Sequence, residues 1–174
     1  MRTLMLAAPV AAVVAAPAVA QTPGWKTWSY ADSGFQIDGP GQPQTQAQAV
    51  QNGDSSLAMN VVVFRAENVA YIVTATNVSS IPDAKTADPE QMVESIKQGA
   101  LQDQTLLAET KEAYPGLATR DFSVGSDGKR IRMRAVYSYP FAYSIMVATD
   151  DAHAASLTDA SAQRFYKSFK ILKR

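Results

Sequence analysis

The clearest alternation of apolar and polar residues lies between Lys129 and Tyr139. One set of alternate positions holds Ile131, Met133, Ala135, Tyr137 and Tyr139, and the other begins with Arg130, Arg132 and Arg134. Side chains alternate between the two faces of a β-strand, so a period of two predicts a strand with one buried face. We expect this strand to lie in an antiparallel sheet with its arginine face in water.

A hairpin is predicted on the N-terminal side of this strand. Asp127-Gly128 tolerates positive φ and is typical of a tight connection between two strands. With a loop of about four residues, Asp121 in the preceding run would lie opposite Arg132 on the wet face. A third run, AYSIMVAT, follows Pro140, which cannot donate a hydrogen bond to a neighbouring strand. Together the three runs predict a β-meander.

Other segments of the chain also have the pattern of strands. An opening hairpin is predicted from WKTWSY and GFQID, an edge strand from Thr45 to Gln51, and two long strands from LAMNVVVFR and AYIVTATNV. The two long strands are broken at Glu67-Asn68 and have consecutive apolar residues at their centres, which indicates cover on both faces. We therefore expect helices to pack on part of each face of the sheet.

Two helices are predicted. The first begins at Asp88-Pro89, where aspartate caps the helix and proline takes the first helical position, and we expect it to run to about Glu109. Its interior Gly99 predicts a close approach of another backbone. The second begins at Thr158 or Asp159 and carries Phe165 and Phe169 one turn apart on its core face.

The N-terminal segment has the three parts of a secretory signal peptide. Arg2 precedes a long apolar run that ends in Ala18-Val19-Ala20, a small-x-small cleavage site. We expect residues 1–20 to be a cleaved signal peptide and residues 21–174 to be a single periplasmic domain with no transmembrane segment. The chain has no cysteine, which excludes thiol chemistry, disulfide bonds and thiolate metal sites.

Charge and motifs argue against several classes of function. Once Arg2 is removed, 15 Lys or Arg stand against 16 Asp or Glu, so no global field attracts nucleic acid, and we expect no nucleic-acid partner. The chain contains no GxxxxGK[ST], GxGxxG or HExxH motif, the usual signatures of nucleotide hydrolysis, dinucleotide redox chemistry and zinc proteolysis. We expect no cofactor, and binding is favoured over catalysis.

The row Arg130, Arg132 and Arg134 is the first candidate site. Guanidinium groups on one strand face are about 7 Å apart and could bind phosphate, carboxylate or a polyanionic envelope polymer. The alternative is an ordinary wet strand face, kept charged to prevent edge pairing. Asp121 would neutralise part of the row.

A second candidate site is the cluster of Asp150, Asp151 and His153, which includes the only histidine of the chain. Carboxylate and imidazole donors are the ligands of a mixed metal site, so a small metal-binding protein or enzyme is the alternative function. The competing interpretation is a polar loop whose aspartates cap turns and the following helix.

The order of these elements resembles that of the PsbP-like proteins. The resemblance rests on the opening WSYADSGFQIDGP, the hairpins, the helix after a proline-containing cap, the meander and the closing RFYKSFKI, and it spans nearly all of residues 21–174. It implies an α+β fold in which helices flank an antiparallel sheet of about six or seven strands. It also implies an exported, non-enzymatic binding or assembly factor, with a protein or an anionic envelope component as partner.

Overall fold

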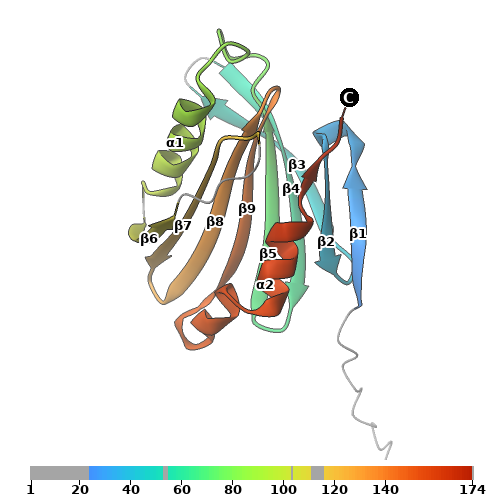
Figure 1. Ribbon diagram of the computed structural model, residues 1–174, viewed down its shortest axis with the longest axis vertical. Coiled ribbons are helices and arrows are strands. Elements are labelled where there is room, and N and C mark those ends of the chain that lie inside the picture. Colours follow the sequence, from blue (N-terminus) through green and yellow to red (C-terminus); the bar gives the residue numbers. More distant parts are fainter. Residues whose placement is uncertain (1–23, 53–54, 103, 111–115, 174) are drawn as a thin grey trace, which may run out of the picture.

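The computed structural model describes residues 24–52, 55–102, 104–110 and 116–173, so the predicted signal peptide lies outside the described residues. A seven-stranded antiparallel sheet, in the order β3-β4-β5-β9-β8-β7-β6, forms its centre (Figure 1). Its strands are β3 (Gln44–Asn52), β4 (Ser55–Ala66), β5 (Val69–Asn77), β6 (Thr105–Thr110), β7 (Thr119–Ser126), β8 (Lys129–Ser138) and β9 (Phe141–Asp150). The predicted meander is β7, β8 and β9, and it occupies one half of this sheet.

A second layer covers one face of the central sheet. It consists of a three-stranded sheet, β1 (Trp25–Tyr30), β2 (Phe35–Pro40) and β10 (Lys170–Ile171), together with helix α2 (Ala160–Ser168). In Figure 1 α2 lies across the near face of the central sheet, beside the β1–β2 hairpin. The core between the layers is rich in aromatic rings, including Phe35, Phe64, Tyr143 and Phe165. This core connects α2 and the small sheet to β4, β5 and β9.

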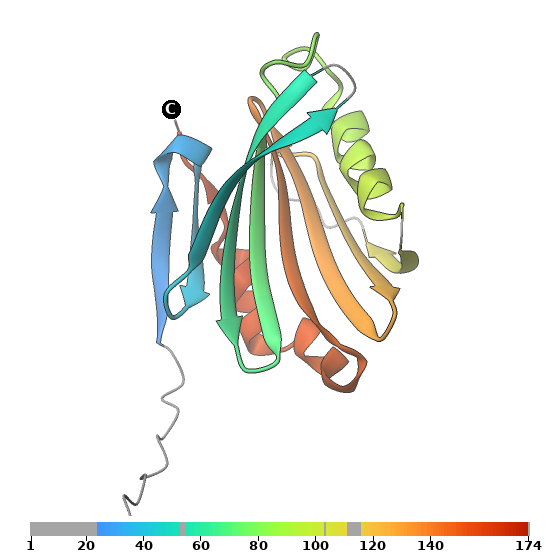
Figure 2. The same cartoon turned by 180° about the vertical axis from the view of Figure 1, so that it is seen from behind.

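Helix α1 (Pro89–Ala100) lies on the opposite face, over the β7–β9 half of the sheet (Figure 2). Val93 is its fully buried anchor, in a second core that contains Phe122, Val124 and Tyr137. The Tyr137 hydroxyl donates a hydrogen bond to the carbonyl oxygen of Ala84 in the loop before the helix. The predicted α+β class, an antiparallel sheet of about six or seven strands flanked by helices, is therefore confirmed, and the central sheet has seven strands.

Both helices begin where their capping residues predict. The Asp88 carboxylate accepts a hydrogen bond from the N–H of Glu90 at 3.0 Å, and Pro89 is the first helical residue. The Asp159 carboxylate accepts from the N–H of Ala162 at 2.8 Å. These contacts satisfy donors at the helix N-termini that have no partner within the helix.

The predicted register of the β7–β8 hairpin is wrong by two residues. Asp127 (φ 47°) and Gly128 (φ 75°) alone form the turn, so Ser126 pairs with Lys129 and Asp121 lies opposite Arg134 rather than Arg132. Two consecutive residues with positive φ match the right-handed twist of the flanking strands, which favours this short connection over a loop of about four residues. A shift of two leaves each side chain on its predicted face.

The predicted end of the first helix is also wrong. α1 stops at Ala100, and residues Thr105–Thr110 form the edge strand β6, because β7 offers an unpaired edge whose hydrogen bonds outweigh local helix propensity. Gly99 is exposed, and a Cβ there would have nothing within 4 Å, so the predicted close approach is absent. A close approach of a different kind occurs at Gly39, where a Cβ would lie 2.4 Å from the ring of the Phe64 side chain.

Candidate functional site

The arginines of β8 share one face of the strand but have three different environments. This face points toward the layer that contains α2, where Tyr166 lies against both Arg132 and Arg134. The row is therefore partly covered by a helix. It is not the fully wet strand face that the alternation predicts.

Arg134 is buried in an ion pair with Asp121. Its Nε and Nη2 atoms donate to the two carboxylate oxygens of Asp121, each at 2.7 Å. Arg134 is 5% exposed and Asp121 2% exposed. The expectation that Arg134 lies in water is wrong, because the two-residue turn brings Asp121 directly opposite it. This arginine holds β7 and β8 together across the covered face.

Arg132 lies at the edge of this pair. Its Nη2 is 3.6 Å from Oδ2 of Asp121, and its guanidinium centre lies 4.9 Å from the centroid of the Tyr166 ring. The Tyr166 hydroxyl donates to the backbone carbonyl of Arg132 at 2.6 Å, and burial raises the pKa of this phenol. Tyr166 therefore stays neutral and acts as a flat support for the cation.

A hollow of about 300 Å³ opens between β8 and α2 at this point; we call it the β8–α2 pocket. Its lining is Arg132, Arg134, Gln163, Tyr166 and Lys167. The lining thus holds three cationic side chains and no carboxylate, and one of the three, Arg134, is paired with Asp121. The excess positive charge and the donors of Gln163 and Lys167 suit an anionic group that accepts several hydrogen bonds.

Sequence reasoning did not find Gln163 and Lys167. They are four residues apart and so lie one turn apart on the exposed side of α2. That spacing is visible in the sequence, but the pairing of this helix face with the arginines of β8 is a tertiary contact that no local pattern encodes.

Arg130 joins the two sites that the sequence predicts separately. Its Nε donates to the carboxylate of Asp151 in the 3₁₀ segment η2 (Asp151–Leu157). Both side chains are partly exposed to solvent. This surface pair occupies Arg130, and it takes Asp151 away from the other members of the predicted metal cluster.

The rest of that cluster is engaged in local hydrogen bonds. The Oδ1 atom of Asp150 accepts from the N–H of His153 at 2.9 Å and lies 2.6 Å from its Nδ1. The Nε2 atom of His153 lies 2.9 Å from Nδ2 of Asn68 in the β4–β5 turn. The hydrogen bond with the His153 side chain lowers the pKa of the Asp150 carboxyl. Asp150 caps η2, as the competing interpretation predicts.

No group of three or more His, Cys, Asp or Glu side chains among the described residues is placed to hold a metal ion. Asp150, Asp151 and His153 all belong to those residues, so the structure gives the metal hypothesis no geometric support. Metal analysis of the purified protein remains its direct test.

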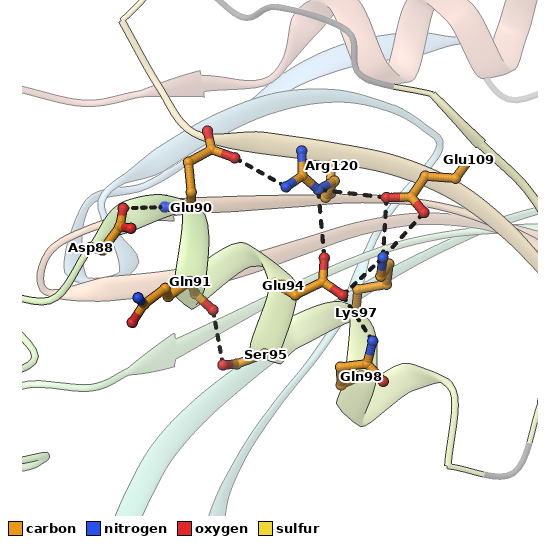
Figure 3. A network of polar contacts seen from close by, with 9 residues as sticks. All are labelled: Asp88, Glu90, Gln91, Glu94, Ser95, Lys97, Gln98, Glu109 and Arg120. Carbon is orange, nitrogen blue, oxygen red and sulfur yellow. Dashed lines mark hydrogen bonds and ion pairs between the residues drawn. The ribbon is translucent and has the colours of Figure 1, made fainter.

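A charged network fastens α1 to the edge of the sheet (Figure 3). Arg120 of β7 lies 3.1 Å from Glu90, 3.7 Å from Glu94 and 3.5 Å from Glu109. Lys97 lies 2.9 Å from Glu94 and 3.1 Å from Glu109 of β6. Glu90 and Glu94 lie one turn apart on α1, and because Arg120 pairs with both, this helix face is not merely solvated. The residues of this charged network come from α1, β6 and β7, so no local sequence pattern reveals the network.

This network predicts a pH dependence of stability. Hydrogen bonds from Gln98 and Lys97 lower the pKa of Glu94 below 4.5, so its contribution is present above that value and is lost as the pH falls through the lowered pKa. We expect Glu94→Gln to cost up to about 1 kcal/mol near neutral pH, because the side chain is partly exposed. Urea unfolding at a series of pH values should show this difference closing in acid. A difference in unfolding free energy between wild type and variant that stays constant into the acid range would contradict a lowered pKa of Glu94.

At alkaline pH, the contribution of Lys97 to stability changes with pH in the opposite direction. Hydrogen bonding to Glu94 raises the pKa of Lys97 above 10.5, so its contribution is complete below that value and is lost as the pH rises through the raised pKa. The network therefore stabilises α1 throughout the pH range between the lowered pKa of Glu94 and the raised pKa of Lys97.

The fold of this chain is PsbP-like. The solution structure of cyanobacterial PsbP (CyanoP) from Synechocystis sp. PCC 6803 is similar, with a TM-score of 0.52 over 91% of this chain and 98% of that chain. The two sequences are 10% identical, so the similarity establishes the fold alone. No protein-family model and no curated protein sequence matches the chain. Within its described residues, no helix is long and apolar enough to cross a membrane.

Proposed function

We propose that this protein is an exported, non-enzymatic binding or assembly factor whose β8–α2 pocket takes an anionic group of an envelope partner. The observation that supports the proposal is the arrangement of Arg132, Lys167 and Gln163 around a hollow of about 300 Å³ beside a buried ion pair. The PsbP-like fold and the signal-peptide pattern of residues 1–20 agree with an exported binding protein.

The three arginines of β8 have different partners, and this difference supports a binding site at Arg132. Arg134 and Asp121 neutralise each other and fix the floor of the pocket, and Arg130 is paired with Asp151. Arg132 is held between this floor and the Tyr166 ring, with its guanidinium partly open to solvent. A carboxylate or phosphate that enters here can bind the Arg132 fork and then the flexible Lys167 ammonium.

Binding of inorganic phosphate to the purified protein tests the pocket. We expect phosphate to raise the melting temperature above that in chloride at equal ionic strength, because a ligand of the native state stabilises it by mass action. Arg132→Gln combined with Lys167→Gln should weaken the apparent affinity about tenfold or more, since a hydrogen bond to a charged group is worth about 1.5–3 kcal/mol.

Arg164→Gln is the matched control, because it removes one positive charge from the same helix outside the pocket. Arg164 binds Asp38 of β2 at 3.0 Å and lies over the Trp25 ring. The control should keep the phosphate response. The control removes one positive charge and the double variant removes two, so a loss of affinity per charge that is as large in the control would show that only net charge matters, and would overturn the pocket.

A further inference from the structure

Strand β3 forms one edge of the central sheet. It contributes no residue to the β8–α2 pocket, so a role of this edge does not rest on the pocket. Its nine residues pair with β4 in one continuous register, from Gln44 opposite Val63 to Asn52 opposite Ser55. Residues 44–49 are all exposed. Among the described residues no strand pairs with the other side of β3. Its outward N–H and C=O groups are therefore available to a further strand.

The two edges of the sheet differ in how they are protected. β6, the other edge, has a register shift between Leu106 and Ala108 and carries Glu109. β3 has the sequence QTQAQAVQN, with no charge and no proline, and its pairing with β4 has no bulge. Charges, prolines and bulges are the usual means by which an edge strand avoids pairing. β3 lacks all three.

The sequence of β3 is complementary to itself. Gln44, Gln46 and Gln48 alternate along one face, so an antiparallel pair of β3 strands centred on Gln46 places Gln44 of each copy opposite Gln48 of the other, and Gln46 opposite itself. A glutamine amide both donates and accepts hydrogen bonds, so glutamine is its own partner across strands. Thr45 then lies opposite Ala47, and no like charges meet.

We propose that β3 pairs with β3 of a second copy of this chain, which joins two central sheets into one antiparallel sheet about a two-fold axis at Gln46. Such an interface is isologous, because each copy contributes the same strand. The absence of charge argues for a second copy rather than for a charged peptide, which would find no complementary charge on β3.

The test is the molar mass of the protein, purified after expression with its own N-terminal segment, by light scattering during size-exclusion chromatography. At about 100 μM, a concentration that populates weak self-association, we expect a dimer. Gln46→Lys and Gln46→Glu should each weaken the dimer about tenfold or more, because like charges would then face each other at the two-fold axis. An equal mixture of the two variants should restore a dimer that contains one of each.

Thr105→Lys places the same charge on the β6 edge and should leave the dimer intact. A monomeric wild-type protein would overturn the proposal. A Gln46→Lys variant that associates as tightly as the wild type would overturn it too, because the interface would then lie elsewhere. Variants that are monomeric alone and stay monomeric when mixed would also contradict pairing at Gln46.

Discussion

Arg134→Met is expected to lower the free energy of unfolding by about 3–5 kcal/mol, the usual cost of removing one partner of a buried ion pair. The substitution leaves the Asp121 carboxylate, which is 2% exposed, without its two hydrogen bonds from Arg134. Arg132, at 3.6 Å from Asp121, replaces that interaction only in part. Urea unfolding of the wild type and the variant measures the loss.

Arg130→Met is the matched control on the same strand and the same face. Arg130 pairs with Asp151 at the surface, where an ion pair is worth about 0–1 kcal/mol. The two variants should therefore differ by several-fold in the stability they lose. Equal losses would contradict the finding that the arginines of β8 have different roles.

Phe165→Ala is expected to cost about 3–5 kcal/mol, the range for truncation of a buried aromatic residue. Phe165 is fully buried in α2, with ring centroids 5.2 Å from Tyr71 and 6.2 Å from Phe64. Its removal leaves a cavity between α2 and the central sheet, and the loss should appear in urea unfolding.

Tyr139→Ala removes an aromatic ring that is 41% exposed in the β8–β9 turn, and so serves as the control. We expect its cost to stay below about 1 kcal/mol, since it leaves no buried cavity. A Phe165→Ala variant that loses no more than this control would show that α2 is not needed to hold the layers together.

The elements of the fold could be predicted where a local rule decides them. The alternation around Met133 defines β8, Asp88-Pro89 marks the start of α1, and Phe165 identifies the buried face of α2. Phe169, predicted on the same helix, is buried in the same core but lies just beyond the end of α2 in an extended conformation. The wrong predictions came from tertiary competition. The end of α1 depends on the open edge of β7, and the register of the hairpin depends on whether Asp127-Gly128 alone can close it.

The candidate site could be predicted only in part. The sequence identifies the arginine row, but it cannot show that Asp121 neutralises Arg134 while α2 brings Lys167 to Arg132. The residues come from β7, β8 and α2, and the contacts among them span long separations in the chain. Local periodicity assigns a face to each residue but does not say which element covers that face.

The central claim, that the β8–α2 pocket recruits a partner, is tested most directly by affinity recovery from a periplasmic extract with mass spectrometry. The baits are the wild type, the Arg132→Gln/Lys167→Gln variant and the Arg164→Gln control, with Arg134 kept intact so that the fold is preserved. We predict one reproducible partner that the wild type and the control retain and the double variant loses. Equal recovery by all three baits would contradict a role for the pocket, and so would the absence of any partner with the wild type.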